Sequence, residues 1–150
     1  MLNKGFTIIE LMVVMGVFAV LASITTLSLS NSQHSSYLNT SVSTMVTDLK
    51  RQQLKAMLGD TEGRGVSSTY GLNFETGRYT LYHDAYSSTE PTNFIINLEG
   101  TIQISTPGNV VFAKGNGEPT GLSTITLRDS VSGRQKTLTL NKYGVITNVN

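Results

Sequence analysis

Few residues in this sequence could carry out chemistry. The 150-residue chain has no cysteine and two histidines, so it can form neither a disulfide framework nor a thiolate metal site. We expect His34 in a solvated helical linker and His83 at a strand end, with no readable Ser–His–Asp arrangement around either. Asp60 and Glu62 fall in a loop, where solvated carboxylates are expected. The glycine-rich run 114–121 lacks the Gly-Lys-Ser/Thr ending of a phosphate-binding loop. We therefore predict no enzymatic activity, no cofactor and no metal.

One acidic residue, Glu10, lies where a charge is costly. It is the one charged side chain in the 24 residues 6–29. As a helix rising about 1.5 Å per residue, this run would be about 36 Å long, enough to cross a hydrocarbon core of about 30 Å. A carboxylate in such a span is penalised, and the dipole of the first helical turn compensates for less than that cost. We therefore expect Glu10 to meet an opposite charge.

The N-terminal segment has two interpretations. A basic start at Lys4, an apolar stretch and small residues before Ser23 are typical of an ordinary secretory signal peptide. Glu10 argues against that interpretation, because a signal peptide gains nothing from a charge inside its apolar stretch. The two interpretations predict different mature N-termini.

Lys4, Gly5, Phe6 and Glu10 together resemble the start of type IV pilins and type II secretion pseudopilins. That family has a short basic leader ending in glycine, then phenylalanine, then an apolar helix with glutamate at its fifth position. The resemblance implies that prepilin peptidase, a membrane aspartyl peptidase, cuts between Gly5 and Phe6. It also implies that the new Phe6 amine is N-methylated. Both reactions act on this protein and require no catalysis by it.

The same resemblance implies what happens after the cut. Glu10 would pair with the Phe6 ammonium of a neighbouring subunit in a low-dielectric helix bundle, where an unpaired charge is penalised. That pair would set the register of a helical filament. The implied partners are other pilin or pseudopilin subunits, an inner-membrane assembly platform and the lipid bilayer. The implied location is the bacterial cytoplasmic (inner) membrane, crossed once, with the C-terminal domain outside the cytoplasm.

A single long helix is expected to carry these residues. An amphipathic stripe continues to residue 58, and Gly59–Gly65 indicates a helix stop followed by a loop. Residues 30–36 are poor helix formers and are expected to bend or fray. The stripe that should pack on a domain comprises Leu38, Val42, Met45, Leu49, Gln52 and Ala56, widened by Val46 and Leu54.

After the helix, the pattern changes to period two with closely spaced turns. This change predicts an α+β fold in which the long helix packs on an antiparallel β domain of about eight short strands. The strands are expected at 70–74, 78–83, 94–98, 101–105, 110–113, 123–129, 135–141 and 145–149. The predicted divisions are a leader at 1–5, a transmembrane and filament-core helix at 6–29, an amphipathic continuation at 30–58 and a globular β domain at 59–150.

The β domain resembles the GspH/FimT class of minor pseudopilins. Tyr70–Phe74 with Gly77–Tyr79 is similar to the first hairpin of that class, and 110–127 is similar to its strand, glycine-rich turn and strand. Lys136–Asn141 followed by Tyr143–Ile146 is similar to its closing strands. The resemblance implies a minor subunit of a type IV pilus or of a type II secretion pseudopilus.

The alternative is a DNA-binding minor pilin of a competence or DNA-uptake system. Arg128, Arg134, Lys136 and Lys142 could form a basic patch near the C-terminus. The chain as a whole has 11 Lys and Arg against 10 Asp and Glu, so it lacks the basic excess of a dedicated nucleic-acid binder. DNA is therefore possible as a partner but is not favoured.

Overall fold

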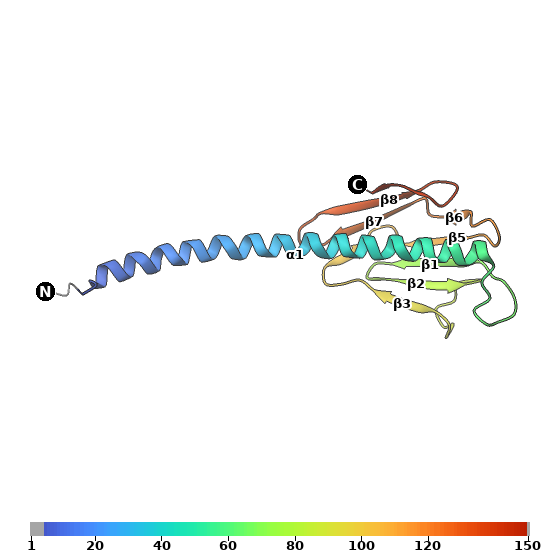
Figure 1. The fold of residues 1–150 in the computed structure, drawn as a ribbon, viewed down its shortest axis with the longest axis horizontal. Helices are drawn as coiled ribbons and strands as arrows, with labels where there is room; N and C mark the ends of the chain where they lie inside the picture. The colour runs from blue at the N-terminus through green and yellow to red at the C-terminus, as the bar shows by residue number, and fades with distance from the viewer. Residues whose placement is uncertain (1–4, 150) are drawn as a thin grey trace.

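One helix dominates the computed structural model. The structure describes residues 5–149, with the side chains of 24–31 and 148 outside the description, so most of the predicted leader lies outside it. Helix α1 (Ile8–Leu58) has 51 residues and curves gently along its length (Figure 1). It is continuous across residues 30–36, where a bend or fraying was predicted. The end of that segment is held by the β domain, because His34 and Ser35 contact side chains there.

The ends of α1 follow from local capping. Thr7 caps the N-terminus in extended conformation, and Gly59 ends the helix in the left-handed region at φ 64°. The amide N–H groups of Gly59 and Asp60 donate to the carbonyl oxygens of Ala56 and Lys55. The helix stop predicted at Gly59 is thus confirmed.

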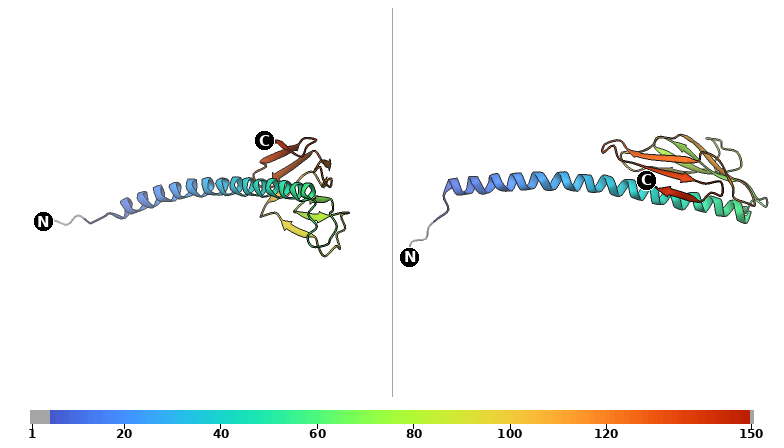
Figure 2. Two further views of the ribbon diagram at one scale, coloured as in Figure 1. Left: turned by 45° about the vertical axis from the view of Figure 1, so that its right-hand side comes forward. Right: turned by 90° about the horizontal axis from the view of Figure 1, so that it is seen from above.

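Two antiparallel sheets form the β domain, and α1 lies along one side of both (Figure 2). The strand orders are β3-β2-β1-β5-β6 and β4-β7-β8-β9. The first sheet comprises β1 (Tyr70–Glu75), β2 (Arg78–His83), β3 (Phe94–Asn97), β5 (Gly108–Phe112) and β6 (Pro119–Gly121). The second comprises β4 (Ile102–Ile104), β7 (Thr124–Asp129), β8 (Gln135–Leu140) and β9 (Ile146–Val149).

The α+β fold is as predicted, with nine strands among the described residues in place of about eight. The additional strand is β6, which lies inside the predicted glycine-rich turn and pairs with β5. Pro119 opens this edge strand, a position where a missing N–H costs no ladder hydrogen bond.

The core forms between the amphipathic half of α1 and the sheets. All six residues of the predicted stripe are buried, and Val46 packs partly buried beside them. Leu54 is 54% exposed, so its predicted place in the stripe is wrong. Tyr70, Phe74 and Phe112 are among the largest side chains that the sheets contribute.

Two glycine turns close over the C-terminal end of α1. Gln53 Nε2 donates to the carbonyl oxygens of Gly117 (3.1 Å) and Tyr143 (2.7 Å). Gly117 and Gly144 both have φ near +70°, and a Cβ at either would collide with Met57 or Gln53 of the helix. Glycine is required at these two turns because the helix approaches the backbone so closely.

Candidate processing and assembly site

The predicted cleavage site lies on exposed, non-helical chain. Gly5, Phe6 and Thr7 precede the first turn of α1, and Phe6 is 88% exposed. A Cβ at Gly5 would meet nothing within 4 Å. The fold of the described chain therefore does not shield the Gly5–Phe6 bond.

Glu10 closes a capping box at the start of α1. Glu10 Oε2 accepts from Thr7 N (2.8 Å) and from Thr7 Oγ1 (2.8 Å), while Glu10 N donates to Thr7 Oγ1 (3.3 Å). The Thr7-x-x-Glu10 spacing is the sequence signature of this motif, and the sequence-based interpretation above missed it. Within the described chain, Glu10 Oε1 accepts no hydrogen bond. One oxygen of the carboxylate is engaged locally and the other is available to a partner.

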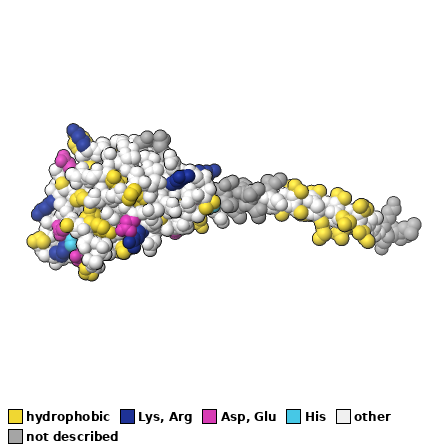
Figure 3. Space-filling model, turned by 180° about the vertical axis from the view of Figure 1, so that it is seen from behind, with side chains coloured by type: hydrophobic (Ala, Val, Ile, Leu, Met, Phe, Trp, Pro, Cys, Tyr) yellow, Lys and Arg dark blue, Asp and Glu magenta, His cyan; other side chains and the backbone are white. Residues whose placement is uncertain are grey.

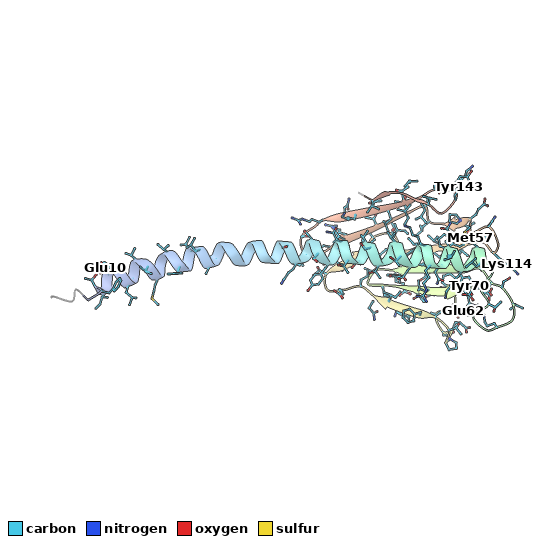
Figure 4. The ribbon with its side chains drawn as sticks, viewed as in Figure 1. Glu10, Met57, Glu62, Tyr70, Lys114 and Tyr143 are labelled. Carbon is cyan, nitrogen blue, oxygen red and sulfur yellow. The ribbon has the colours of Figure 1, made fainter. Side chains whose placement is uncertain are left out.

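Within the described residues, no other part of the chain covers the apolar first half of α1 as far as Leu21. The large hydrophobic side chains from Phe6, just before the helix, to Leu21 are all exposed, and they form the yellow stretch in Figure 3. Phe18, for example, is 68% exposed. Such a surface requires an apolar environment supplied from outside the chain. Glu10 lies within it (Figure 4).

A search of the described residues for a helix both long and apolar enough to cross a membrane finds none. The predicted transmembrane segment includes residues 24–29, whose side chains lie outside the described residues.

Of the four predicted DNA-contacting residues, Arg134 and Lys136 line one cavity, but Arg128 lies on the other face of the sheet from Lys136. Arg128 pairs with Gln135 across β7 and β8 and is exposed, whereas Lys136 pairs with Leu127, which is buried. Successive residues of a strand face opposite sides of a sheet, so Arg128 and Lys136 lie on opposite faces.

The other two cations have contacts of their own. Arg134 hydrogen bonds to Ser35 of α1. Lys142 lies over the ring of Tyr143, with its Nζ 4.8 Å from the ring centre. DNA binding through these four residues stays a prediction.

His34 was predicted to lie in a solvated linker, and that prediction is wrong. Its Nδ1 is 2.9 Å from Oδ2 of Asp129, whose side chain is fully buried. Burial alone would raise the pKa of Asp129. Hydrogen bonds from Thr101 Oγ1, Ser132 Oγ and the amide of Val131, together with the charge of His34, outweigh burial and hold that pKa well below its ordinary value. The cluster ties α1 to the turn between β7 and β8.

The remaining candidates are also accounted for by structural contacts. His83 ends β2, as predicted, and its ring nitrogens contact Asp84 and Thr92. Glu62 is not simply solvated, because it forms ion pairs with Lys55 and Arg64. Among the described residues, no three His, Asp or Glu side chains are grouped as metal ligands.

The comparisons with known proteins point to the N-terminus. Residues 1–26 match the family model described as the prokaryotic N-terminal methylation motif. None of the curated proteins and none of the solved structures matches the chain. The matched range contains Gly5, Phe6 and Glu10, so the motif and the exposed helix start coincide.

Proposed function

We propose that this chain is a precursor of the type IV pilin and pseudopilin family and serves as a minor filament subunit. The support for the family is the N-terminal methylation motif at residues 1–26. Prepilin peptidase cuts it between Gly5 and Phe6, and the Phe6 amine is methylated. Residues 6–29 hold it in the inner membrane until an assembly platform moves it into a helical filament. The observation that carries the proposal is an N-methylation motif on a helix whose large apolar side chains lie uncovered as far as Leu21.

In the filament, Glu10 sets the register by pairing with the Phe6 ammonium of a neighbouring subunit. The support for this role is geometric. Glu10 Oε2 is already held by Thr7 beside the new chain end, and Oε1 is free of described donors. A preorganised carboxylate loses less conformational entropy on pairing than a mobile one.

The assignment to the GspH/FimT class of minor subunits rests on the β domain. Hairpin β1–β2 and the glycine turn that packs against the end of α1 occur where that resemblance predicts them. The machine served is either a type IV pilus or a type II secretion pseudopilus.

The test is the N-terminus of the mature protein, read by mass spectrometry from membranes of cells that contain the peptidase. A methylated Phe6 is the expected result. A chain beginning at Ser23 would overturn the proposal and restore the ordinary signal peptide.

Replacing Gly5 with leucine should leave the uncut precursor in the membrane, because a bulky side chain then precedes the scissile bond.

The alternative function, DNA binding, has its own measurement. A shift of double-stranded DNA by the protein, weakening steeply as salt rises, would support it. Absent or salt-insensitive binding would remove it.

A further inference from the structure

An open cavity of about 410 Å³ lies where α1 meets the β domain. Its wall is shared between the helix and the residues around the start of β8, and comprises Ser35, Leu38, Asn39, Arg134, Gln135 and Lys136. The turn between β7 and β8 lies at the end of the β domain that faces the N-terminal half of α1 (Figure 1). Lys and Arg side chains occur at this end of the domain (Figure 3). The cavity is therefore next to the part of the helix that carries the apolar run.

The wall of this cavity has two cations and no acidic residue. Arg134 contacts Ser35 Oγ through one guanidinium nitrogen, and a guanidinium has five N–H donors in all. Within the described chain, neither Arg134 nor Lys136 forms an ion pair. The acidic residue at the end of β7, Asp129, is fully buried. An anion from outside the chain would therefore meet uncompensated positive charge in the cavity.

The backbone directs Lys136 toward the helix. In the β7–β8 ladder Lys136 lies opposite Leu127, which is buried, so its side chain leaves the sheet on the core face. It is half-buried and lines the same cavity as Leu38 of α1. A lysine in such a place lays its aliphatic stem on apolar surface and keeps its ammonium at the polar boundary.

The position of the cavity along α1 identifies the anion. Residues 11–29 have no charged side chain, and these 19 residues (29 − 11 + 1) form about 29 Å of helix. That length matches a hydrocarbon core of about 30 Å, with Glu10 at one boundary. Ser35 lies six residues beyond Leu29, about 9 Å further along the helix. The headgroup layer is about 5–7 Å thick on each side of the core, so the cavity lies within reach of the lipid phosphates.

We propose that this cavity binds the phosphate of an anionic phospholipid at the outer surface of the inner membrane before assembly. The inference rests on the proposed function, because it requires a precursor held in that membrane. The phosphodiester accepts hydrogen bonds from the guanidinium of Arg134 and the ammonium of Lys136. Zwitterionic lipids carry a cation of their own beside the phosphate, so a net-anionic lipid is preferred. These contacts hold the β domain on the membrane in one orientation until the subunit is withdrawn.

A lipid suits these cations better than DNA, which offers the same phosphodiester. Arg128 lies on the other face of the sheet from Lys136. Lys142 is next to Tyr143, whose carbonyl oxygen contacts the C-terminal half of α1, far from the cavity. The four basic residues therefore form no continuous track for a duplex, whereas one lipid phosphate needs only the two cations of the cavity.

The experiment adds lipids to the ¹⁵N-labelled full chain in dodecyl maltoside micelles and follows its backbone amide resonances. The probes are phosphatidylglycerol, phosphatidylcholine with the same acyl chains, inorganic phosphate and a short DNA duplex. We expect shifts centred on the cavity with phosphatidylglycerol, at a mole fraction about tenfold lower than phosphatidylcholine requires. Equal shifts with the two lipids would overturn the proposal. So would inorganic phosphate or the duplex binding at the cavity as tightly as phosphatidylglycerol, because the site would then be a free-anion or DNA site.

Variants locate the effect. Lys136→Gln should raise the half-saturating mole fraction of phosphatidylglycerol about fivefold, because one of the two cations is lost. Lys142→Gln is the matched control, since it removes the same charge from an exposed lysine outside the cavity and should leave binding unchanged. An equal loss in Lys142→Gln would show general charge attraction and would refute the site. Lys136 has no ion pair to lose within the described chain, so its variant should keep the unfolding temperature of the unaltered protein.

The mature N-terminus separates this inference from the proposed function. If Phe6 is methylated and phosphatidylglycerol produces no shift at the cavity, the lipid site alone is refuted. A chain that begins at Ser23 would refute the membrane-held precursor and the lipid site together, because most of the apolar run would be removed.

Discussion

At Glu10, one carboxylate oxygen holds the first turn of α1 and the other faces no described donor. The capping box gives Glu10 a role within a single chain, and that role does not require a charge. Glutamine occupies the same position in capping boxes, because its side-chain oxygen can also accept from the N-cap N–H. A charge is needed only where an ammonium must be met. The two roles can therefore be separated by one substitution.

We predict that Glu10→Gln will be cut normally between Gly5 and Phe6 but will enter filaments about tenfold less than the unaltered protein, because the buried ammonium of the neighbour loses its counter-charge. Glu10→Ala should behave similarly. The measurement is the ratio of mature protein in sheared filaments to that in membranes. Thr7→Val is the matched control, since it removes the capping hydroxyl and keeps the carboxylate. Normal incorporation of Glu10→Gln together with failure of Thr7→Val would assign Glu10 to capping alone.

Between elements, the contact of His34 with Asp129 fastens α1 to the β7–β8 turn. The pKa of Asp129 is lower in the folded protein than in the unfolded chain. Its ionised form therefore stabilises the fold above the unfolded pKa of about 3.9, and this stabilisation is lost as the pH falls from there through the folded pKa.

We predict that Asp129→Asn will lower the free energy of unfolding at pH 7 by about 1–3 kcal/mol, because hydrogen bonds to a buried charged acceptor are weakened or lost. The difference from the unaltered protein should shrink as the pH falls below about 4. Denaturant unfolding at several pH values measures both effects. A difference that stays constant between pH 7 and pH 3 would contradict the role of the ionised carboxylate.

The glycine-rich turn 114–121 positions a second contact between elements. Gly117→Ala should destabilise the protein by about 1–3 kcal/mol, through left-handed strain and collision with Met57. Gly115→Ala is the matched control, because Gly115 also has positive φ but a Cβ there would meet nothing within 4 Å. Thermal unfolding of the two variants separates the collision from the strain. Equal losses would show that contact with the helix contributes nothing.

For the molecule as a whole, periodicity predicted the helix stripe and most strands, because a buried face requires spacings of three and four in a helix and two in a strand. It could not predict β6, which forms from Pro119 to Gly121 because β5 offers an edge. The contact of His34 with Asp129 joins residues 95 positions apart (129 − 34), and nothing in either local sequence marks it. At the N-terminus, the methylation motif could be predicted from the sequence because it is a local pattern.

The two halves of α1 differ in how their apolar side chains are covered. From Ile8 to Leu21 the large hydrophobic side chains of α1 are exposed, whereas the first buried core residue of its described part is Leu38. We therefore predict that a fragment of residues 32–150 will be a folded, monodisperse protein without detergent, since it keeps the core and the His34–Asp129 contact. A fragment beginning at residue 40 loses that contact and Leu38, and should unfold at a temperature several degrees lower. Size-exclusion chromatography and thermal unfolding test the pair. If the longer fragment aggregates or unfolds, the N-terminal half of α1 contributes to the domain in a way that the exposure of its side chains does not show.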